Sequence, residues 1–137
     1  MDGRVVGLFT CPVAGEKMQE VVRVEAVAGL GLKGDRYYAS EGSFNKGAQG
    51  RRQVTLINGI FFKGSGFQYP DSRRNIITKG VELMWLIGKE FQVGAAKFLG
   101  VKYCDPCNRP SNLCSKEKSF KESFFDRGGL VADIIEG

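Results

Sequence analysis

The stretch EFQVGAAKFLGVKYCDPC, residues 90–107, indicates the class of fold. Its β-branched and aromatic residues form two short runs around Gly94, which predicts strands over residues 90–94 and 96–103. The second predicted strand leads directly into two cysteines that are separated by two residues. Such a pair can share a metal ion, form a reversible disulfide, or remain as two inert thiols in a turn.

More strands are expected on both sides of this stretch. Apolar and polar residues alternate most clearly over residues 20–27, as in a strand with one buried face. Val81, Met84 and Trp85 have helical spacing, so residues 81–87 are predicted to form a helix, with Trp85 among the core positions. The other predicted elements are strands over residues 4–10, 53–57, 72–78 and 130–135 and a short helix over residues 120–125.

Length and composition favour one domain that is mainly β. A chain of 137 residues is within the usual range for a single domain, so we expect one domain over residues 1–137. Nineteen glycines accompany only 4 prolines, which indicates many turns and close backbone approaches rather than a disordered or collagen-like chain. The fold class is therefore predicted as β-rich α+β with a few short helices.

The charged residues exclude several functions. The chain contains no histidine, so a Ser-His-Asp triad, a Cys-His pair and histidine-based zinc sites are impossible. Twenty Lys and Arg against 15 Asp and Glu leave a net charge of +5, which is small for a nucleic-acid-binding domain, and no motif of such domains is present. Nucleic acid is not an expected partner.

The sequence predicts neither a membrane span nor a secretory signal. Its apolar runs are far shorter than the roughly 18 residues that a membrane helix needs. We therefore expect a cytoplasmic protein, with no membrane partner, whose four cysteines are reduced.

Two groups of residues could carry chemistry. Arginines next to Gly, Asp or Asn in predicted loops are suited to bind phosphate or carboxylate, although solvated surface arginine is the alternative. Three clustered cysteines could instead hold zinc, with Cys11 or a carboxylate as the fourth ligand. The arginines are Arg36, Arg51, Arg52, Arg73, Arg74 and Arg127, and the clustered cysteines are Cys104, Cys107 and Cys114.

Five motifs in one order resemble the MOSC domain, the C-terminal module of molybdenum-cofactor sulfurases, in its small stand-alone bacterial form. The resemblance covers essentially the whole chain. The motifs are GLKGDR (31–36), RQVTLI (52–57), RRNIITKG (73–80) with the following FQVG (91–94), CDPC (104–107) and RGGLVA (127–132).

This resemblance implies a closed or partly open β-barrel and a role in molybdenum or sulfur metabolism. Family members include reductases of N-hydroxylated compounds and proposed sulfur carriers, and the family is also associated with pyridoxal phosphate. By resemblance, Cys107 is the catalytic residue and metal ligand. The residues implied in binding molybdopterin are Asp35, Arg36, Arg73, Arg74, Asn75 and Thr78.

Three functional alternatives stay open at the level of sequence. The first is a molybdenum-cofactor-binding protein, served by an electron-donor or cofactor-accepting protein. The second is a non-enzymatic carrier with a persulfide on Cys107, which Cys104 could resolve as a disulfide. The third is a zinc or thiol-redox protein. Family members commonly have His after the Gly-Asp-Arg motif, whereas this chain has Tyr37.

Overall fold

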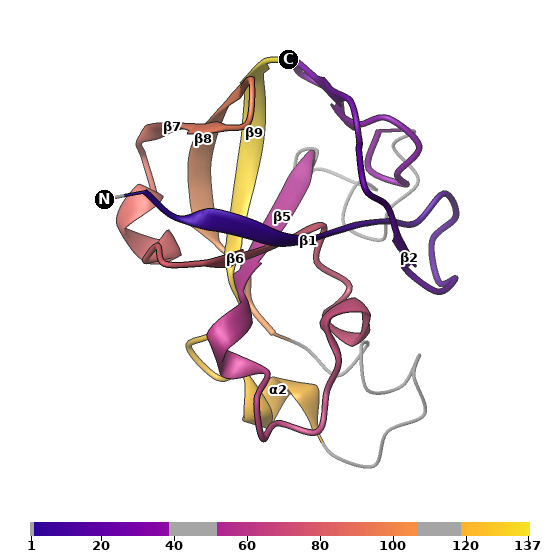
Figure 1. Ribbon diagram of the computed structural model, residues 1–137, viewed down its shortest axis with the longest axis vertical. Coiled ribbons are helices and arrows are strands. Elements are labelled where there is room, and N and C mark those ends of the chain that lie inside the picture. Colours follow the sequence, from indigo (N-terminus) through magenta and orange to yellow (C-terminus); the bar gives the residue numbers. More distant parts are fainter. Residues whose placement is uncertain (1, 39–51, 107–118) are drawn as a thin grey trace.

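A curled sheet of seven strands forms most of the fold (Figure 1). The computed structural model describes residues 2–38, 52–106 and 119–137. The strands of the sheet are β1 (Arg4–Thr10), β2 (Gln19–Glu20), β5 (Val54–Asn58), β6 (Ile76–Lys79), β7 (Glu90–Val93), β8 (Ala96–Tyr103) and β9 (Leu130–Glu136). Across the sheet they lie in the order β2-β1-β6-β5-β9-β8-β7.

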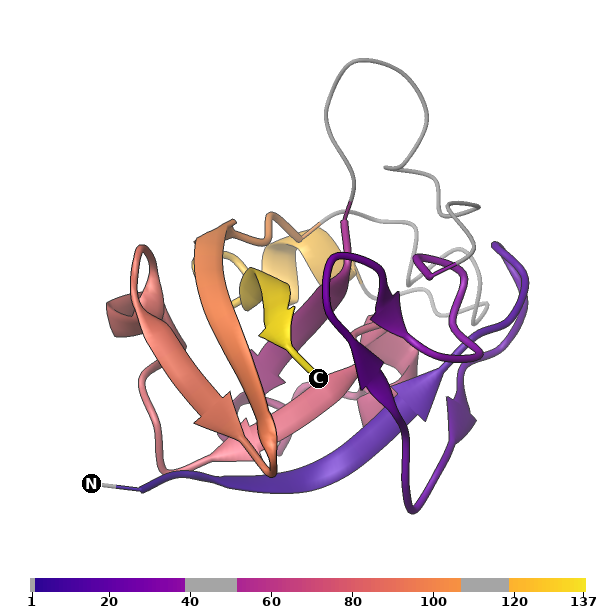
Figure 2. The ribbon, with the colours of Figure 1, turned by 90° about the horizontal axis from the view of Figure 1, so that it is seen from above.

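The sheet curls into a partly open barrel, as the view from above shows (Figure 2). A separate pair of short strands, β3 (Ala26–Val27) and β4 (Gly31–Leu32), lies beside it. The helical elements are short: the 3-10 helices η2 (Gly59–Phe61), η3 (Tyr69–Ser72) and η4 (Leu83–Leu86), and the α-helix α2 (Phe120–Ser123). The prediction of a mainly β, barrel-like fold with a few short helices is confirmed.

Strands β5 and β6 pair in parallel, which requires a long connection between them. Residues 59–75 supply that connection through η2 and η3. The 3-10 helix η2 begins this connection directly after Asn58.

One row of paired residues crosses the sheet and brings distant segments together. The register pairs Ile76 of β6 with Leu56 of β5, Leu56 with Leu130 of β9, and Leu130 with Tyr103 of β8. Leu8 of β1 lies opposite Ile76 on the other side. The residues that flank this row belong to segments far apart in sequence, so the sheet places them within reach of one another.

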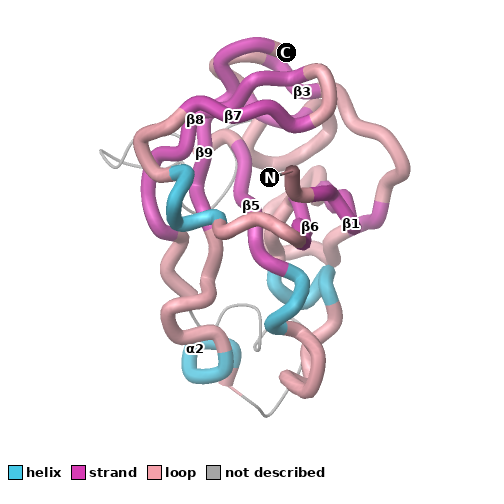
Figure 3. The backbone as a smooth tube through the Cα atoms, turned by 60° about the vertical axis from the view of Figure 1, so that its left-hand side comes forward, coloured by secondary structure: helices cyan, strands magenta, loops and turns pink. Residues whose placement is uncertain are grey.

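Two apolar clusters lie on opposite faces of β6. Ile76 belongs to the cluster inside the barrel, whereas Ile77 belongs to a second cluster that is rich in phenylalanine. Successive side chains of a strand point to opposite faces, which accounts for this division. Phe120 and Phe124, in α2 and at its end, stack with ring centroids 4.5 Å apart and close the second cluster. Figure 3 shows α2 at the end of the molecule opposite to β3 and the C-terminus.

The predicted strand over residues 20–27 is wrong in part. Of this range, only the residues in β2 and β3 are in strands. Val21 still donates to the carbonyl of Leu8 over 2.9 Å, but after it the chain leaves β1 and crosses to the place where β3 pairs with β4. Val22 is fully exposed, at 101% of its reference area, so the alternation in sequence does not mark a buried face there.

The predicted helix over residues 81–87 is also wrong. The segment forms only the 3-10 helix η4, because Ile87 is extended and bridges Gly100 of β8. Trp85 is 75% exposed and not part of the core, since the faces of a 3-10 turn differ from those of an α-helix. The predicted strand over residues 72–78 begins later, at Ile76, because η3 ends at Ser72 and Arg73 has a left-handed conformation.

Candidate functional site

The candidate site surrounds the connection between η3 and β6. We call it the motif junction, because residues from all five sequence motifs meet there. It comprises Cys11, Asp35, Arg36, Thr55, Arg73, Arg74, Asn75, Cys104, Asp105 and Gly128.

Arg73 has an unusual backbone conformation, with φ at 62°. A non-glycine residue adopts this region only when its surroundings hold it there. Its guanidinium donates from Nη1 to the carbonyl of Glu16 over 2.6 Å. Its own carbonyl accepts a hydrogen bond from Arg36 Nη2 over 3.3 Å. Contacts from the first part of the chain therefore fix the turn at both its side chain and its main chain.

Asp35 supplies a buried carboxylate that organises the Gly-Asp-Arg motif. It is 2% exposed, and its oxygens accept from the main-chain N–H groups of Cys11 over 2.9 Å and Tyr37 over 3.2 Å. It also forms an ion pair with Arg36 at 3.2 Å. Its charge is thus compensated by three donors, as a buried carboxylate requires.

Arg36 connects that motif to the Arg-Arg-Asn motif. Besides Asp35 and the carbonyl of Arg73, its guanidinium donates to the hydroxyl of Tyr37 over 3.2 Å and lies 4.3 Å from the centre of the Tyr37 ring. Tyr37, at the position where the family commonly has His, therefore acts as a hydrogen-bond acceptor and stacking partner for Arg36. It offers no imidazole that could be protonated near neutral pH.

Arg74 connects the Arg-Arg-Asn motif to the two C-terminal motifs. Its Nε donates to the carbonyl of Gly128 over 2.8 Å, and its Nη2 donates to the carbonyl of Asp105 over 3.5 Å. A third bond runs from Nη1 to the carbonyl of Ser72 at 3.1 Å. A guanidinium can direct its donors to several acceptors in one plane, which a lysine cannot do.

Asn75 is fully buried and holds three strands together. Its Oδ1 accepts from the N–H of Thr55 over 3.0 Å, and its Nδ2 donates to the carbonyl of Phe9 over 3.2 Å. These bonds tie β6 to both β5 and β1 directly beside the row of paired residues.

Two cysteines of the described chain are buried at the motif junction. The thiol of Cys11 donates to the carbonyl of Val13 over 2.8 Å and lies 3.7 Å from Arg73 Nη2. The sulfur of Cys104 lies 3.6 Å from Arg52 Nη1. Cys11 was expected only as a remote zinc ligand, although its position just after a predicted strand could have served as a signal.

The remaining predicted thiols, Cys107 and Cys114, lie outside the described residues. Within residues 2–38, 52–106 and 119–137, no three His, Cys, Asp or Glu side chains gather as metal ligands would.

Thr78 lies in a different environment from the other predicted binding residues. Its hydroxyl donates to Asn58 Oδ1 over 3.2 Å. It lines a cavity of about 690 Å³ together with Leu56 and Val93, on the barrel side of β6.

Among the described residues, the motif junction holds more buried guanidinium groups than buried carboxylates. Three guanidinium groups and one carboxylate are buried there: Arg36 at 5%, Arg73 at 7%, Arg74 at 7% and Asp35 at 2% exposure. Buried charges of one sign are costly unless a partner of opposite sign lies near. Guanidinium groups gathered in this way are suited to bind an anion.

Tyr103 adds a neutral polar group beside the junction. Its hydroxyl accepts from the N–H of Gly128 over 3.3 Å. Burial raises the pKa of Tyr103 above its ordinary value, and nearby Asp105 and Asp126 act in the same direction. The hydroxyl thus stays protonated at neutral pH and adds no negative charge to the junction.

In the described part of the chain, none of the helices has the length and apolar composition to cross a membrane.

Solved structures share this fold at low sequence identity. The YuaD protein from Bacillus subtilis is similar with a TM-score of 0.78 and 16% identity, over 99% of this chain and 89% of that one. YiiM from Escherichia coli has a TM-score of 0.69 and 16% identity, over 99% of this chain and 63% of that one. A hypothetical protein of known structure has a TM-score of 0.68 and 17% identity, over 99% and 62%.

Sequence comparison adds no relative: no family model and no curated protein matches the chain. This chain spans somewhat less than two thirds of YiiM and of the hypothetical protein. At these identities the likeness establishes a shared fold, so the three structures identify the architecture of the chain and leave its activity to be proposed from its own residues.

Proposed function

We propose that this chain is a MOSC-type domain that binds an anionic cofactor of the molybdopterin class at the motif junction. The observation that carries the proposal is the meeting of all five motifs around three buried guanidinium groups and, among the described residues, one buried carboxylate. A phosphate-bearing cofactor carries negative charge, which guanidinium groups bind strongly.

The three buried arginines fit an anionic cofactor by their charge and their position, although their hydrogen bonds are made to main-chain carbonyls. Arg36, Arg73 and Arg74 direct donors to main-chain carbonyls and are more than nine-tenths buried. They would attract an anion through their charge and would hold the backbone that receives it. The strained turn at Arg73 is the element whose shape they maintain.

A thiolate is the natural protein ligand for a soft metal, and Cys107 is the residue that we propose for this role. The main chain that leads to it is positioned by Arg74, which binds the carbonyl of Asp105. When bound, a molybdenum centre supplies two-electron redox chemistry, while the protein supplies binding and electrostatics. The substrate class we propose is N-hydroxylated compounds, on the resemblance alone.

A sulfur carrier is the second candidate function, and the surroundings of Cys104 favour it. Its sulfur lies 3.6 Å from Arg52 Nη1, so this thiol has a cationic hydrogen-bond donor beside it. In this account the Cys107 thiolate receives the outer sulfur of a donor protein's persulfide, then passes that sulfur to a thiolate of an accepting protein and is released as a thiolate again.

Matched cysteine variants test both functions. The protein and its Cys107→Ser and Cys114→Ser variants are purified from a host that makes molybdenum cofactor, and each is analysed for molybdenum and for pterin fluorescence after oxidation. We expect Cys107→Ser to lose molybdenum and Cys114→Ser to retain it. Equal molybdenum in both variants would refute the role of Cys107. One extra sulfur atom on Cys107, found by mass spectrometry without molybdenum, would establish the carrier instead.

A further inference from the structure

A concave site lies on the outer face of β6, the face from which Ile77 and Lys79 project. It has a volume of about 880 Å³, within the range of small-molecule pockets. η2, the loop after it and η3 form one wall, and β1, β2 and β6 contribute the other. The lining residues that concern the ligand are Phe9, Phe62, Phe67, Lys63, Tyr69 and Lys79.

The apolar part of this pocket is built from aromatic rings. Phe9, Phe62 and Phe67 are between 3% and 6% exposed, so their rings are fixed in the second apolar cluster. The ring of Phe62 meets that of Tyr69 edge to face, with centroids 5.1 Å apart. A flat apolar group would find stacking and edge contacts against such a wall.

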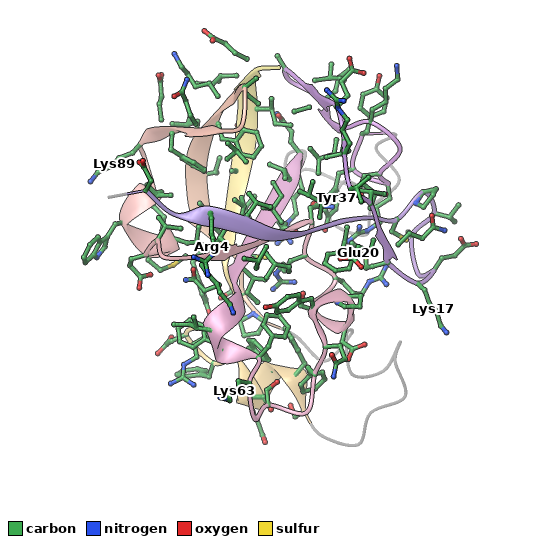
Figure 4. All side chains as sticks on the ribbon, viewed as in Figure 1. Arg4, Lys17, Glu20, Tyr37, Lys63 and Lys89 are labelled. Carbon is green, nitrogen blue, oxygen red and sulfur yellow. The ribbon has the colours of Figure 1, made fainter. Side chains whose placement is uncertain are left out.

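The polar part is cationic. Lys63 and Lys79 both line the pocket, and within the described residues neither forms an ion pair. Arg4 lies directly opposite Lys79 in the register of β1 and β6 and adds a positive charge at this end of the pair. Glu20 also lines the pocket from β2, and Figure 4 shows it well apart from Lys63.

Gly59 brings the polar groups together. A Cβ atom there would lie 3.1 Å from the hydroxyl oxygen of Tyr69 and 3.4 Å from Cε of Lys79. The Tyr69 hydroxyl and the Lys79 side chain therefore both lie over the bare backbone of Gly59. A carboxylate beside these two groups, on the pocket side, could accept from the hydroxyl and from the ammonium group together, which is stronger than either bond alone.

We propose that this pocket binds a small aromatic carboxylate. The carboxylate would lie between Lys79, Lys63 and the Tyr69 hydroxyl, and the ring would lie against Phe62 and Phe67. The pocket is separate from the motif junction, although Met18 borders both, since its sulfur accepts from Arg36 Nη1 over 3.6 Å. The proposal does not depend on molybdenum or on Cys107.

Methionine provides a local probe of binding. In protein labelled with ¹³C at its methionine methyl groups, 2-naphthoate should shift the Met18 signal and leave that of Met84, in η4, unchanged. The signals are assigned with Met18→Leu and Met84→Leu. A Met84 shift as large as that of Met18, or no Met18 shift at all, would overturn the proposal.

Two chemical controls separate the contributions of charge and shape. The neutral alcohol 2-naphthalenemethanol has the same ring without the carboxylate, and we expect its affinity to be lower by about tenfold or more. Inorganic phosphate has charge without a ring and should not displace naphthoate at equal concentration. Equal affinity for the alcohol would contradict the role of the lysines in binding the carboxylate. Displacement of naphthoate by phosphate would contradict the role of the aromatic wall.

Lysine variants test the residues themselves. Lys79→Met and Lys63→Met keep most of the aliphatic stem and remove the charge, so each should weaken naphthoate binding by about tenfold. Lys89→Met is the matched control, because Lys89 is exposed and lies away from the pocket (Figure 4). Unchanged affinity for naphthoate in both pocket variants would refute the proposal. Because Lys63 is exposed, its substitution should leave the fold intact, so a loss of affinity in Lys63→Met reports on binding itself.

Discussion

The guanidinium of Arg74 donates from Nε to the carbonyl of Gly128 over 2.8 Å, a contact between residues that are 54 positions apart. The same side chain reaches the carbonyls of Ser72 and Asp105. One buried side chain thus joins three segments of the motif junction. Removing its guanidinium group should break the hydrogen bonds to all three.

Arg74→Lys should therefore destabilise the protein although the charge is retained. A lysine cannot serve three carbonyls in these directions, and buried carbonyls left without donors are costly, so we expect a loss of about 2–4 kcal/mol. Urea unfolding of the variant measures it. Arg127→Lys, at an exposed residue beside Phe61, is the control and should change stability by less than about 0.5 kcal/mol. Equal effects of the two substitutions would contradict this role of Arg74.

Asn75→Leu should be similarly harmful, because Asn75 both donates and accepts between strands. Its loss leaves the N–H of Thr55 and the carbonyl of Phe9 without their side-chain partner. We expect a loss of about 2–4 kcal/mol. Thr78→Val, which removes one hydrogen bond to Asn58, should cost only about 1 kcal/mol. Thermal and urea unfolding of both variants check the order, and a Thr78 effect as large as that of Asn75 would contradict it.

Gly128→Ala tests how closely the two C-terminal motifs approach each other. A Cβ at Gly128 would overlap the carbonyl oxygen of Cys104 and lie 2.8 Å from Cδ of Pro106. The backbone of residues 104–106 would have to move, so we expect a loss of more than about 2 kcal/mol. Gly29→Ala is the matched comparison: φ is +75° there with nothing within 4 Å, and conformational strain alone should cost about 1 kcal/mol. Comparable losses would show that the close approach is not tight.

Asp133 gives the protein a predictable pH dependence. Burial raises the pKa of its carboxyl above the ordinary value. The native state then holds the proton more tightly than the unfolded state, so this group lowers the free energy of unfolding as pH rises between the two pKa values. Asp133→Asn should raise the free energy of unfolding at pH 7, and the gain should vanish below about pH 3, where both forms are neutral.

Urea unfolding at pH 7 and at pH 3 measures that difference. Asp2→Asn, at an exposed position, is the control and should show little difference between the two pH values. A gain for Asp133→Asn that is equal at both pH values would mean that burial of the charge is not its cause.

Local patterns in the sequence predicted most strands, because the runs of β-branched and aromatic residues over 90–103 and 130–135 pair with neighbouring strands. They failed where pairing partners decide the conformation. The bridge from Ile87 to Gly100 shortens the expected helix to η4, and the crossing after Val21 interrupts the expected strand.

The candidate site was predictable only in part, because its contacts are long-range. Resemblance indicated Asp35, Arg36 and the arginine pair, but not that the guanidinium groups donate to main-chain carbonyls. Cys11 was placed only by the fold, since its neighbour Arg73 is 62 positions away. No periodicity in the chain records such a contact.

The cofactor content of the native protein tests the central proposal most directly. The protein is purified from a host that makes molybdenum cofactor, and molybdenum, tungsten, zinc and pterin are determined per mole of chain. The proposal predicts molybdenum, or tungsten, together with pterin in amounts approaching one per chain. Stoichiometric zinc without pterin would contradict it.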